Sequence, residues 1–357
     1  MNTTDLISIS HSFSQVLLLA SQGEKTCSPF IRHTLASHSI ATDGEIFQTM
    51  VIGGSFYQKA KMKKTGEHIE LISHSTGKQP PFPTKQALMT FLQEHIDPHV
   101  SIVAVNFAYA LTPVSRAGML DGIVARGAKE NTFDGLVGYI LGEEIEKHFK
   151  DNFQRTIHVS CGNDTICLLL SGLMSQPWDH LAAGIVGTGL NFAIFVSENE
   201  VVNLEAAEFN TFEQSAAGKV IDAASASPGE APMEKEVSGA YLYQHFNYLI
   251  EQGSINCNPI ASTKELDELT KSADVETAAV AQKVIEHSAH LTAAQIAGIL
   301  QFQKRDLTFI MQGSLFWKGR NYQELVSKQV QKLVPEYIAT YERIDNSDLY
   351  GAAKLVV

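Results

Sequence analysis

An aspartate between a strand and a helix is the residue of this sequence best suited to catalysis. A strand is predicted over 156–160, and the segment Gly162–Thr165, which contains Asp164, follows at the start of a predicted helix. A carboxylate there can accept a proton from a substrate hydroxyl, and the helix N-terminus favours negative charge nearby. The same residues also fit a simple Asx-type helix cap, so this pattern alone leaves both interpretations open.

Two glycine-rich turns have residue types that could bind phosphate. Gly53-Gly54-Ser55 and Gly187-Thr188-Gly189 each lie between predicted apolar strands. Glycine lets the backbone turn tightly and approach a ligand, and neighbouring hydroxyl and N–H groups can hold phosphate oxygens. Neither turn is a P-loop, because no Gly-Lys-Ser/Thr end is present. Each turn alone is more typical of a plain hairpin, and the matching contexts of the two turns strengthen the case for phosphate binding.

The elements that must position these residues alternate between strands and helices. The alternating pattern from Phe47 to His74 predicts a β-meander rather than a strand that feeds a helix. Ser262 and Glu265 form a capping-box pattern before a helix. The other predicted elements are an N-terminal helix within 1–40, helices at about 84–95, 132–149 and 278–303, strands at 102–111, 181–186, 191–196 and 307–310, and a helical tail at 351–355.

Length and charge limit the possible function classes. A chain of 357 residues exceeds what one compact core usually holds, so two lobes are expected. The net charge is -12, with 44% hydrophobic and 18% charged residues, which is typical of a soluble globular protein. This charge argues against a nucleic-acid or anionic-membrane partner. If the chain handles anionic phosphates, it must do so with local donors and metal ions.

The cysteines and the N-terminus indicate no special chemistry or targeting. Cys27, Cys161, Cys167 and Cys257 lack the spacing of a zinc site and are expected to be reduced thiols in a cytoplasmic protein. The apolar run at 16–20 is too short to span a bilayer and follows no basic leader. We expect it to be one side of an amphipathic helix and not a signal peptide.

The region around Asp164 resembles the hexokinase family. His158–Gly172, followed by Ile185–Asn191, is similar to the catalytic loop and second phosphate loop of that family, where Asn-Asp-Thr precedes a helix and Val-Gly-Thr-Gly-x-Asn follows it. Such ordered similarity over nearly the whole chain is not expected by chance. The further matches are Val202–Glu205, Pro228–Lys235, Gly239–Leu242, Ser288–Leu291, Gly313–Leu315 and Gly351–Ala353.

The resemblance implies a role for each matching position. Asp164 would be the catalytic base, and Asn163 would contact the sugar beside it. Carboxylates and amides suit a polyol, because each hydroxyl needs a donor and an acceptor, and unpaired buried groups penalise the wrong sugar. The other implied sugar-binding residues are Lys129, Asn191, Glu205 and Glu234. The implied ATP-binding residues are Gly53, Gly54, Ser55, Gly187, Thr188 and Gly189 at the phosphates, and Gly313 and Ser314 at the adenosine.

Several positions depart from the family pattern. The first phosphate loop of the family begins with an aspartate that commonly helps to hold hydrated magnesium, and here that position is Val51. No residue of this sequence is therefore assigned as a metal ligand, although the resemblance implies both ATP and Mg²⁺. The remaining departures are Ala110 for a sugar-site serine, Gly127-Ala128 for Trp-Thr, Gln312 for an aspartate and His287 for an arginine.

The resemblance implies an α/β fold, namely the two-lobed actin-like ATPase (ribonuclease H-like) fold with a central cleft. The expected divisions are an N-terminal helix packed on the large lobe (1–44), a small lobe (45–162), a large lobe (163–345) and a C-terminal helix that returns to the small lobe (346–357). Sugar binding between the lobes would close the cleft, expel water and align ATP with the hydroxyl.

The implied activity is that of an ATP-dependent hexose kinase in cytoplasmic carbohydrate metabolism, in particular glycolysis. It would transfer the γ-phosphoryl group to a sugar hydroxyl, such as the 6-hydroxyl of glucose or a related hexose. The departures leave open a second function, that of a degenerate hexokinase-like sensor or scaffold that binds sugar or nucleotide without turnover. An actin-like filament or chaperone subunit is a weaker alternative, because such proteins need no sugar-binding carboxylates.

Overall fold

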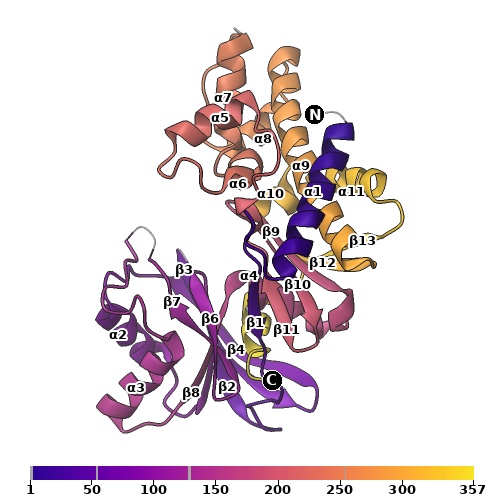
Figure 1. Cartoon of the computed structure of the whole chain (residues 1–357). Helices are drawn as coiled ribbons and strands as arrows, with labels where there is room; N and C mark the ends of the chain where they lie inside the picture. The colour runs from indigo at the N-terminus through magenta and orange to yellow at the C-terminus, as the bar shows by residue number, and fades with distance from the viewer. Residues whose placement is uncertain (1–2, 54, 128–129, 254) are drawn as a thin grey trace. The chain divides into compact units, whose positions relative to one another are not determined.

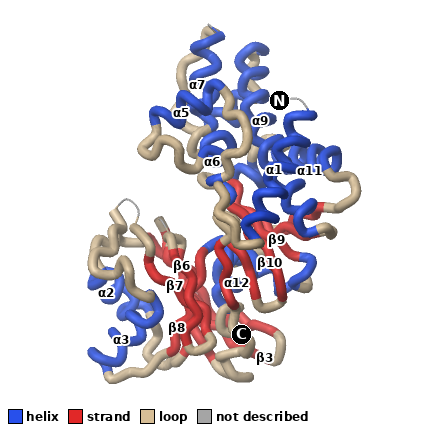
Figure 2. Tube along the Cα trace, viewed as in Figure 1, coloured by secondary structure: helices blue, strands red, loops and turns tan. Residues whose placement is uncertain are grey.

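The chain folds into two compact units (Figures 1 and 2). The computed structural model describes residues 3–53, 55–127, 130–253 and 255–357. Unit 1 comprises the chain up to Ile31 together with Ala182–Ala193 and Asn203–Glu342. Unit 2 comprises Arg32–Leu181, Ile194–Val202 and Arg343–Val357. Residues 163–181, which the sequence assigned to the large lobe, thus lie in the same unit as residues 45–162.

Unit 2 is built on a five-stranded mixed sheet in the order β4-β3-β2-β5-β8. Its first three strands form the antiparallel meander that the sequence predicts, and β5 and β8 continue the sheet in parallel on the other side of β2. Because parallel strands end at one edge, the residues after β5 and β8 lie near each other. The strands are β2 (Ile46–Ile52), β3 (Phe56–Thr65), β4 (His68–Lys78), β5 (Ile102–Phe107) and β8 (His158–Asn163).

Different helices cover the two faces of this sheet. Met50 and Val105 lie in a buried core with side chains of α2 and α3. Side chains alternate along a strand, so their neighbours Val51 and Asn106 point to the opposite face, where α4 and α12 pack. The helices of unit 2 are α2 (Lys85–His95), α3 (Leu141–Phe153), α4 (Asp164–Ser171) and α12 (Ser347–Ala353), with 3₁₀ turns η1 (Gly172–Met174) and η2 (Trp178–His180).

The prediction of a helix from 132 to 149 is wrong in its first half. The helix begins only at Leu141, and the preceding segment contains Phe133, Gly135 and Gly138 with φ of 54°, 82° and 88°. A right-handed helix cannot include such residues. Phe133 is nevertheless fully buried. The spacing of the apolar residues therefore indicated correctly that this segment carries buried side chains, although the segment itself is irregular. The buried strand predicted over 102–111 also ends earlier, at Phe107.

A hairpin formed by β6 (Leu111–Arg116) and β7 (Met119–Val124) was not predicted from the sequence. Its two-residue turn, Ala117-Gly118, has positive φ at both positions, which matches the twist of paired strands. At the end of β6, Arg116 donates to Asp121 at 3.0 Å and to Glu146 at 2.8 Å. The short strands β1 (Ile31–Thr34) and β11 (Glu200–Asn203) also lie mostly in unit 2.

Unit 1 combines strands in the order β10-β9-β12-β13 with a mainly helical segment. The predicted strands at 181–186, 191–196 and 307–310 are confirmed, as is the capping box, in which Ser262 Oγ accepts from Glu265 N at 3.3 Å. The strands are β9 (Leu181–Val186), β10 (Leu190–Ser197), β12 (Leu307–Gln312) and β13 (Ala339–Glu342). The boundary between the two units falls within β10.

The helix α9 forms the centre of unit 1 and is buried along most of its length. Alanine and glycine allow close approach, and Gly298 lies directly against the α1 backbone at Ser10. Among the described residues, no helix has the length and apolar character needed to cross a membrane. The helices of unit 1 are α1 (Thr3–Ser21), η3 (Ala206–Glu208), α5 (Ala216–Ala224), α6 (Pro232–Val237), α7 (Leu242–Gly253), α8 (Thr263–Leu269), α9 (Val275–Gln303), α10 (Ser314–Lys318) and α11 (Tyr322–Leu333).

Candidate active site

Asp164 is the first residue of α4, directly after β8 ends. Asn163 is extended and caps the helix, with its Oδ1 accepting a hydrogen bond from Thr165 N at 3.0 Å. Asp164 Oδ1 accepts from the same N–H at 2.7 Å and from Thr165 Oγ1 at 3.3 Å. Asn163 is therefore the cap, and the Asp164 carboxylate is an additional charged group at the helix start.

The surroundings of Asp164 favour its protonated form. Burial raises the pKa of this carboxyl group above its usual range, and the negative charge of Asp348 raises it further. The hydrogen bonds from Thr165 act in the opposite direction and limit the rise in pKa. A carboxylate with a raised pKa holds a proton more readily than an exposed aspartate, which is the property required of a general base.

In unit 1, two predicted sugar-binding residues are joined through Asn203. Asn191 Nδ2 donates to Asn203 Oδ1 at 2.8 Å, and Asn203 Nδ2 donates to Glu205 Oε1 at 2.8 Å. Asn191 Oδ1 in turn accepts from the backbone N–H of Ala206 at 3.2 Å. These bonds fix the amide orientations and set the Glu205 carboxylate at the end of a polar row. Asn203 was not among the predicted site residues, although it lies in the matched segment 202–205.

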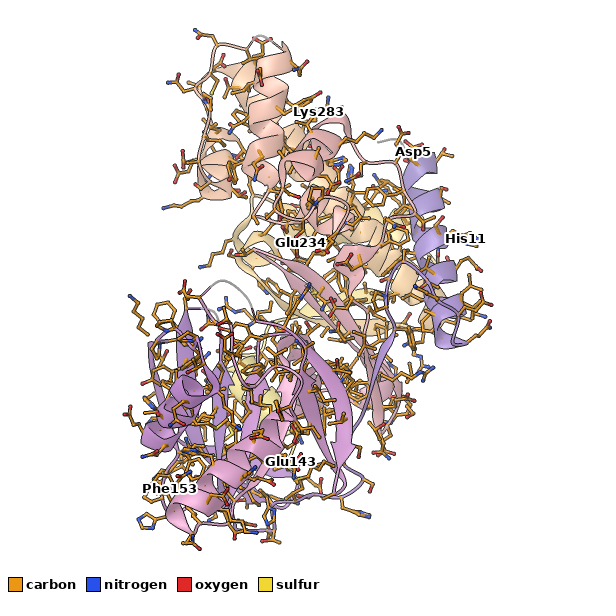
Figure 3. The ribbon with its side chains drawn as sticks, turned by 60° about the vertical axis from the view of Figure 1, so that its left-hand side comes forward. Asp5, His11, Glu143, Phe153, Glu234 and Lys283 are labelled. Carbon is orange, nitrogen blue, oxygen red and sulfur yellow. The ribbon has the colours of Figure 1, made fainter. Side chains whose placement is uncertain are left out.

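Glu234 lies in α6 beside the start of β10 (Figure 3). Its Oε2 accepts a hydrogen bond from Leu190 N at 3.0 Å, and a β-carbon at Gly189 would lie 3.0 Å from the same oxygen. Burial raises the pKa of Glu234, and the nearby charges of Glu208 and Glu205 add to the rise. The structure therefore brings Asn191, Glu205 and Glu234 together around the first residues of β10.

The second glycine turn and the Gly313-Ser314 segment are in direct backbone contact. Gly313 has a φ of 114°, and a β-carbon there would lie 2.2 Å from the Val186 carbonyl oxygen. A β-carbon at Gly187 would lie 3.0 Å from Gly313 Cα. The carbonyl of Gly187 also accepts a hydrogen bond from Gly239 N at 2.7 Å. Glycine is thus required for the ends of β9 and β12 to approach this closely.

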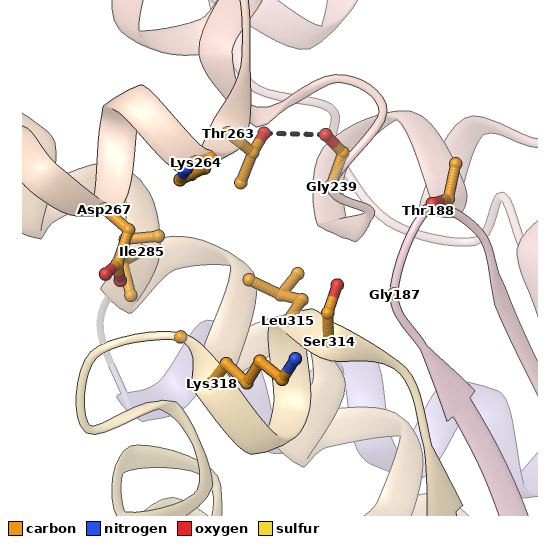
Figure 4. Close-up of a pocket in the computed structure, with 11 residues that line it drawn as sticks. Gly187, Thr188, Gly239, Thr263, Lys264, Asp267, Ile285, Ser314, Leu315 and Lys318 are labelled. Atoms are coloured by element: carbon orange, nitrogen blue, oxygen red, sulfur yellow. Dashed lines mark hydrogen bonds between the residues drawn. The ribbon is translucent and has the colours of Figure 1, made fainter.

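A cavity of about 540 Å³ opens beside these two glycine segments, entirely within unit 1 (Figure 4). Ile285 and Leu315 give it apolar surface, and Lys264 and Lys318 give it positive charge. Thr263 Oγ1 donates to the Gly239 carbonyl at 2.6 Å and fixes one wall. The complete lining is Gly187, Thr188, Gly239, Thr263, Lys264, Asp267, Ile285, Ser314, Leu315, Lys318 and Gly319. The contributions of α8 and α9 to this lining were not predicted from the sequence, because isolated lysine and threonine residues on helices are common.

The first glycine turn is in unit 2, at the end of β2. The Gly53 carbonyl accepts from Tyr109 Oη at 2.9 Å, and the Ser55 carbonyl accepts from Gln79 N at 2.9 Å. Val51, at the position of the family aspartate, is 6% exposed and has no group that could bind a cation. Gly54 and Lys129, both predicted site residues, lie outside the described residues.

The described residues also show what the protein itself could offer to a metal ion. No group of three or more histidine, cysteine or carboxylate side chains is placed among them to hold a metal ion. His287, at the position of a family arginine, is hydrogen-bonded through Nε2 to Glu236 Oε2 at 2.8 Å. A cation in the candidate active site would therefore not be held by a ready-made cluster of these side chains alone.

Comparisons with known proteins agree with the resemblance seen in the sequence. The family described as "Hexokinase" matches residues 244–357. A Schistosoma mansoni hexokinase solved with glucose has a TM-score of 0.78 at 20% identity, covering 100% of this chain and 95% of that one. A second hexokinase crystal structure gives 0.79 at 16%, covering 100% and 96%. No curated protein sequence matches the chain.

A more distant structural relative has the same architecture. The ROK hexokinase from Thermus thermophilus has a TM-score of 0.62 at 14% identity, covering 87% of this chain and 97% of that one. The predicted resemblance to hexokinases is therefore confirmed, and the α/β fold is the actin-like fold of hexokinases and ROK sugar kinases.

Proposed function

We propose that this protein is an ATP-dependent hexose kinase that phosphorylates a sugar hydroxyl, the 6-hydroxyl of glucose or of a related hexose. The observation that carries the proposal is the Asp164 carboxylate, held at the junction of β8 and α4 with a raised pKa. The fold and the family match at 244–357 support sugar phosphorylation in general. The proposal places the protein in cytoplasmic carbohydrate metabolism, with a hexose and ATP as its small-molecule partners.

In this proposal Asp164 accepts the proton of the attacking sugar hydroxyl. The sugar oxygen forms a bond to the γ-phosphorus of ATP, the bond from that phosphorus to the β,γ-bridging oxygen breaks, and ADP leaves. Phosphoryl transfer depends mainly on positioning and charge stabilisation, so a base with two hydrogen bonds from Thr165 suits the reaction. Because these bonds fix Oδ1, they also limit the rotation of the carboxylate.

The row Asn191–Asn203–Glu205 and the nearby Glu234 would bind the sugar, together with Asn163 and Lys129. The observed hydrogen bonds determine which polar atoms each amide can present, and the two carboxylates are acceptors. A hexose satisfies such a set with several hydroxyls. A compound that lacks one hydroxyl leaves a buried group unpaired, which is a strong basis for discrimination.

The cavity of unit 1 would hold the nucleotide. Its volume of about 540 Å³ is in the range of small-molecule sites, and its apolar walls suit an adenine ring. The Gly187–Gly189 turn and Ser314 offer backbone and hydroxyl donors for phosphate oxygens, and Lys318 offers a positive charge. In unit 2, Gly53, Gly54 and Ser55 are proposed to contact the terminal phosphates.

The oxygen atoms around Val51 fit magnesium, which a kinase of this fold uses with ATP. Asn106, the register partner of Val51, has a buried Oδ1 without a hydrogen-bond partner, and the Asp164 carboxylate follows the neighbouring strand. Oxygen ligands of this kind fit Mg²⁺. When bound with ATP, magnesium would neutralise part of the negative charge of the phosphates.

A panel of sugars with Mg-ATP tests the proposal through ADP release. We expect sugar-dependent ADP formation that falls by about 100-fold or more in Asp164→Ala, because a positioned base contributes that much. Asp151→Ala, on the exposed surface of α3, is the matched control and should retain activity. Activity that persists in Asp164→Ala would show that another group is the base.

The second candidate function, binding without turnover, is favoured by the valine at position 51. Under that alternative, calorimetry would detect sugar or nucleotide binding while no sugar in the panel releases ADP. Such a result would reject the kinase and support a sensor or scaffold. ADP release with any hexose would reject the alternative.

A further inference from the structure

A row of three side chains crosses the unit 2 sheet beneath the start of α12. Val51 of β2 is the register partner of Gln58 on one side and of Asn106 on the other. Register partners point to the same face of a sheet, so these three side chains face the same helices. The next position in the row, Gly162, would direct a β-carbon at Cys167 of α4 and Leu355, which identifies that face as the one that α4 and α12 cover.

Asp348, in the first turn of α12, is hydrogen-bonded to both side chains that flank Val51 in this row. Gln58 Nε2 donates to Asp348 Oδ2 at 3.4 Å, and Asn106 Nδ2 donates to the Asp348 carbonyl at 3.4 Å. These donors come from the two strands that flank β2. The sheet lacks a carboxylate at position 51, and the carboxylate of Asp348, on a different segment of the chain, is bound to Gln58, the register partner of that position.

Asn106 provides an independent sign of a missing ligand. Its side chain is 1% exposed, and its Oδ1 makes no hydrogen bond although its Nδ2 reaches the backbone of Asp348. Buried polar atoms almost always have a partner, and leaving one unpaired costs about 1–3 kcal/mol. A cation or its bound water beside Asp348 would satisfy this oxygen.

Asp164 belongs to the same cluster. Helices α4 and α12 pack so closely that a β-carbon at Gly351 would lie 1.7 Å from the Cys167 carbonyl oxygen. Asp164 and Asp348 each lie three residues before these contact points. Two carboxylates held near each other are stabilised by a cation between them.

We propose that Asp348 replaces the aspartate missing at position 51 and, with Asp164 and Asn106, binds the hydrated magnesium of Mg-ATP. Mg²⁺ keeps several of its waters and is usually bound by one or two carboxylates together with phosphate oxygens. Two carboxylates and one amide oxygen meet this requirement. This inference rests on the proposed function, since the nucleotide phosphates supply the remaining ligands.

The test measures Mn²⁺ binding by electron paramagnetic resonance in the presence of ADP and without sugar. Asp348→Asn keeps the shape of the side chain and removes its charge, so we expect the Mn²⁺ affinity to fall by about tenfold or more. Asp345→Asn removes the same charge from an exposed position three residues earlier and should leave the affinity unchanged. In Val51→Asp/Asp348→Asn, the carboxylate returns on the sheet, and we expect most of the affinity to be recovered.

The outcomes separate this inference from the proposed function. Unchanged Mn²⁺ binding in Asp348→Asn, or an equal loss in Asp345→Asn, overturns the inference even if the wild-type protein phosphorylates a sugar. A specific loss in Asp348→Asn that Val51→Asp recovers supports the metal site even if no sugar releases ADP. Circular dichroism of each variant shows whether a loss of binding comes from unfolding.

Discussion

At the scale of single residues, the site depends on carboxylates that the fold keeps partly out of water. Glu234 shows this most clearly, because burial and the charges of Glu208 and Glu205 raise its pKa while only Lys235 and the Leu190 N–H oppose the rise. Such a group weakens the free protein at neutral pH, and a bound polyol can offset that cost.

Glu234→Gln should therefore stabilise the ligand-free protein at neutral pH. The folded-state pKa lies above the ordinary 4.5, so the cost of ionisation is absent at low pH and develops as the pH rises through the folded-state pKa. We expect the Tm of the variant to exceed that of the wild type by about 2 °C at about pH 8, as for a change of about 1 kcal/mol, and by much less at about pH 4.

Melting curves of both proteins across this pH range check the prediction. Glu230→Gln, on the exposed loop before α6, is the matched control and should show no pH-dependent gain. A larger gain at low pH than at high pH would mean that the Glu234 carboxylate is stabilising when ionised.

Some residue roles could be predicted from sequence and others could not. Asp164 stood out because its neighbours at 162–165 are close in the chain. Asp348 did not, because its relation to Val51 arises only when segments 290 residues apart in sequence, at Gln58 and Asp348, meet in the fold. Local patterns do not contain such distances, so only the structure reveals this pairing.

At the scale of elements, the ends of β9 and β12 touch through glycine backbones. Gly313→Ala would place a methyl group 2.2 Å from the Val186 carbonyl oxygen at a φ of 114°, so the two strand ends must separate. We expect a cost of about 1–3 kcal/mol, a Tm lower by several degrees, and ADP affinity reduced by about tenfold or more.

Thermal melting and calorimetry with ADP measure both effects of Gly313→Ala. Gly253→Ala at the end of α7 is the control, because its methyl group would meet only the Ile255 side chain, at 3.3 Å. Normal ADP affinity in a folded Gly313→Ala protein would place the nucleotide elsewhere.

Secondary structure was predictable where the periodicity of the apolar residues agrees with local signals such as helix caps. The meander of β2 to β4 and the helix α2 follow from alternation and from the Thr84 cap of α2. The segment 132–140 was misassigned, because buried apolar residues can have helical spacing while glycines at 135 and 138 turn the chain out of a helix. Spacing shows which residues are buried and does not determine the backbone between them.

At the scale of the whole molecule, each unit has its own part of the proposed chemistry. The cavity next to the second glycine turn belongs to unit 1 alone. ADP without sugar should therefore slow hydrogen exchange at 187–189, 263–267 and 313–319, while α2 in unit 2 keeps its exchange rate, because ligand binding protects the groups that it contacts.

Hydrogen-exchange mass spectrometry with and without ADP follows these peptides directly. Peptides from α7, which lies in unit 1 and contributes no residue to the cavity lining, serve as an internal control. Protection of α2 with none at 313–319 would contradict the assignment of the cavity to the nucleotide.

The late position of α12 in the chain has a consequence for how the protein is made. Unit 2 takes its first segments from before residue 203 and its last from Arg343–Val357, with all of 203–342 between them. A ribosome that synthesises the chain from its N-terminus must release all of 203–342 before α12 can pack against α4. Until then the apolar surface that Leu349 and Val356 later contact stays uncovered, so unit 2 completes its core only late in synthesis.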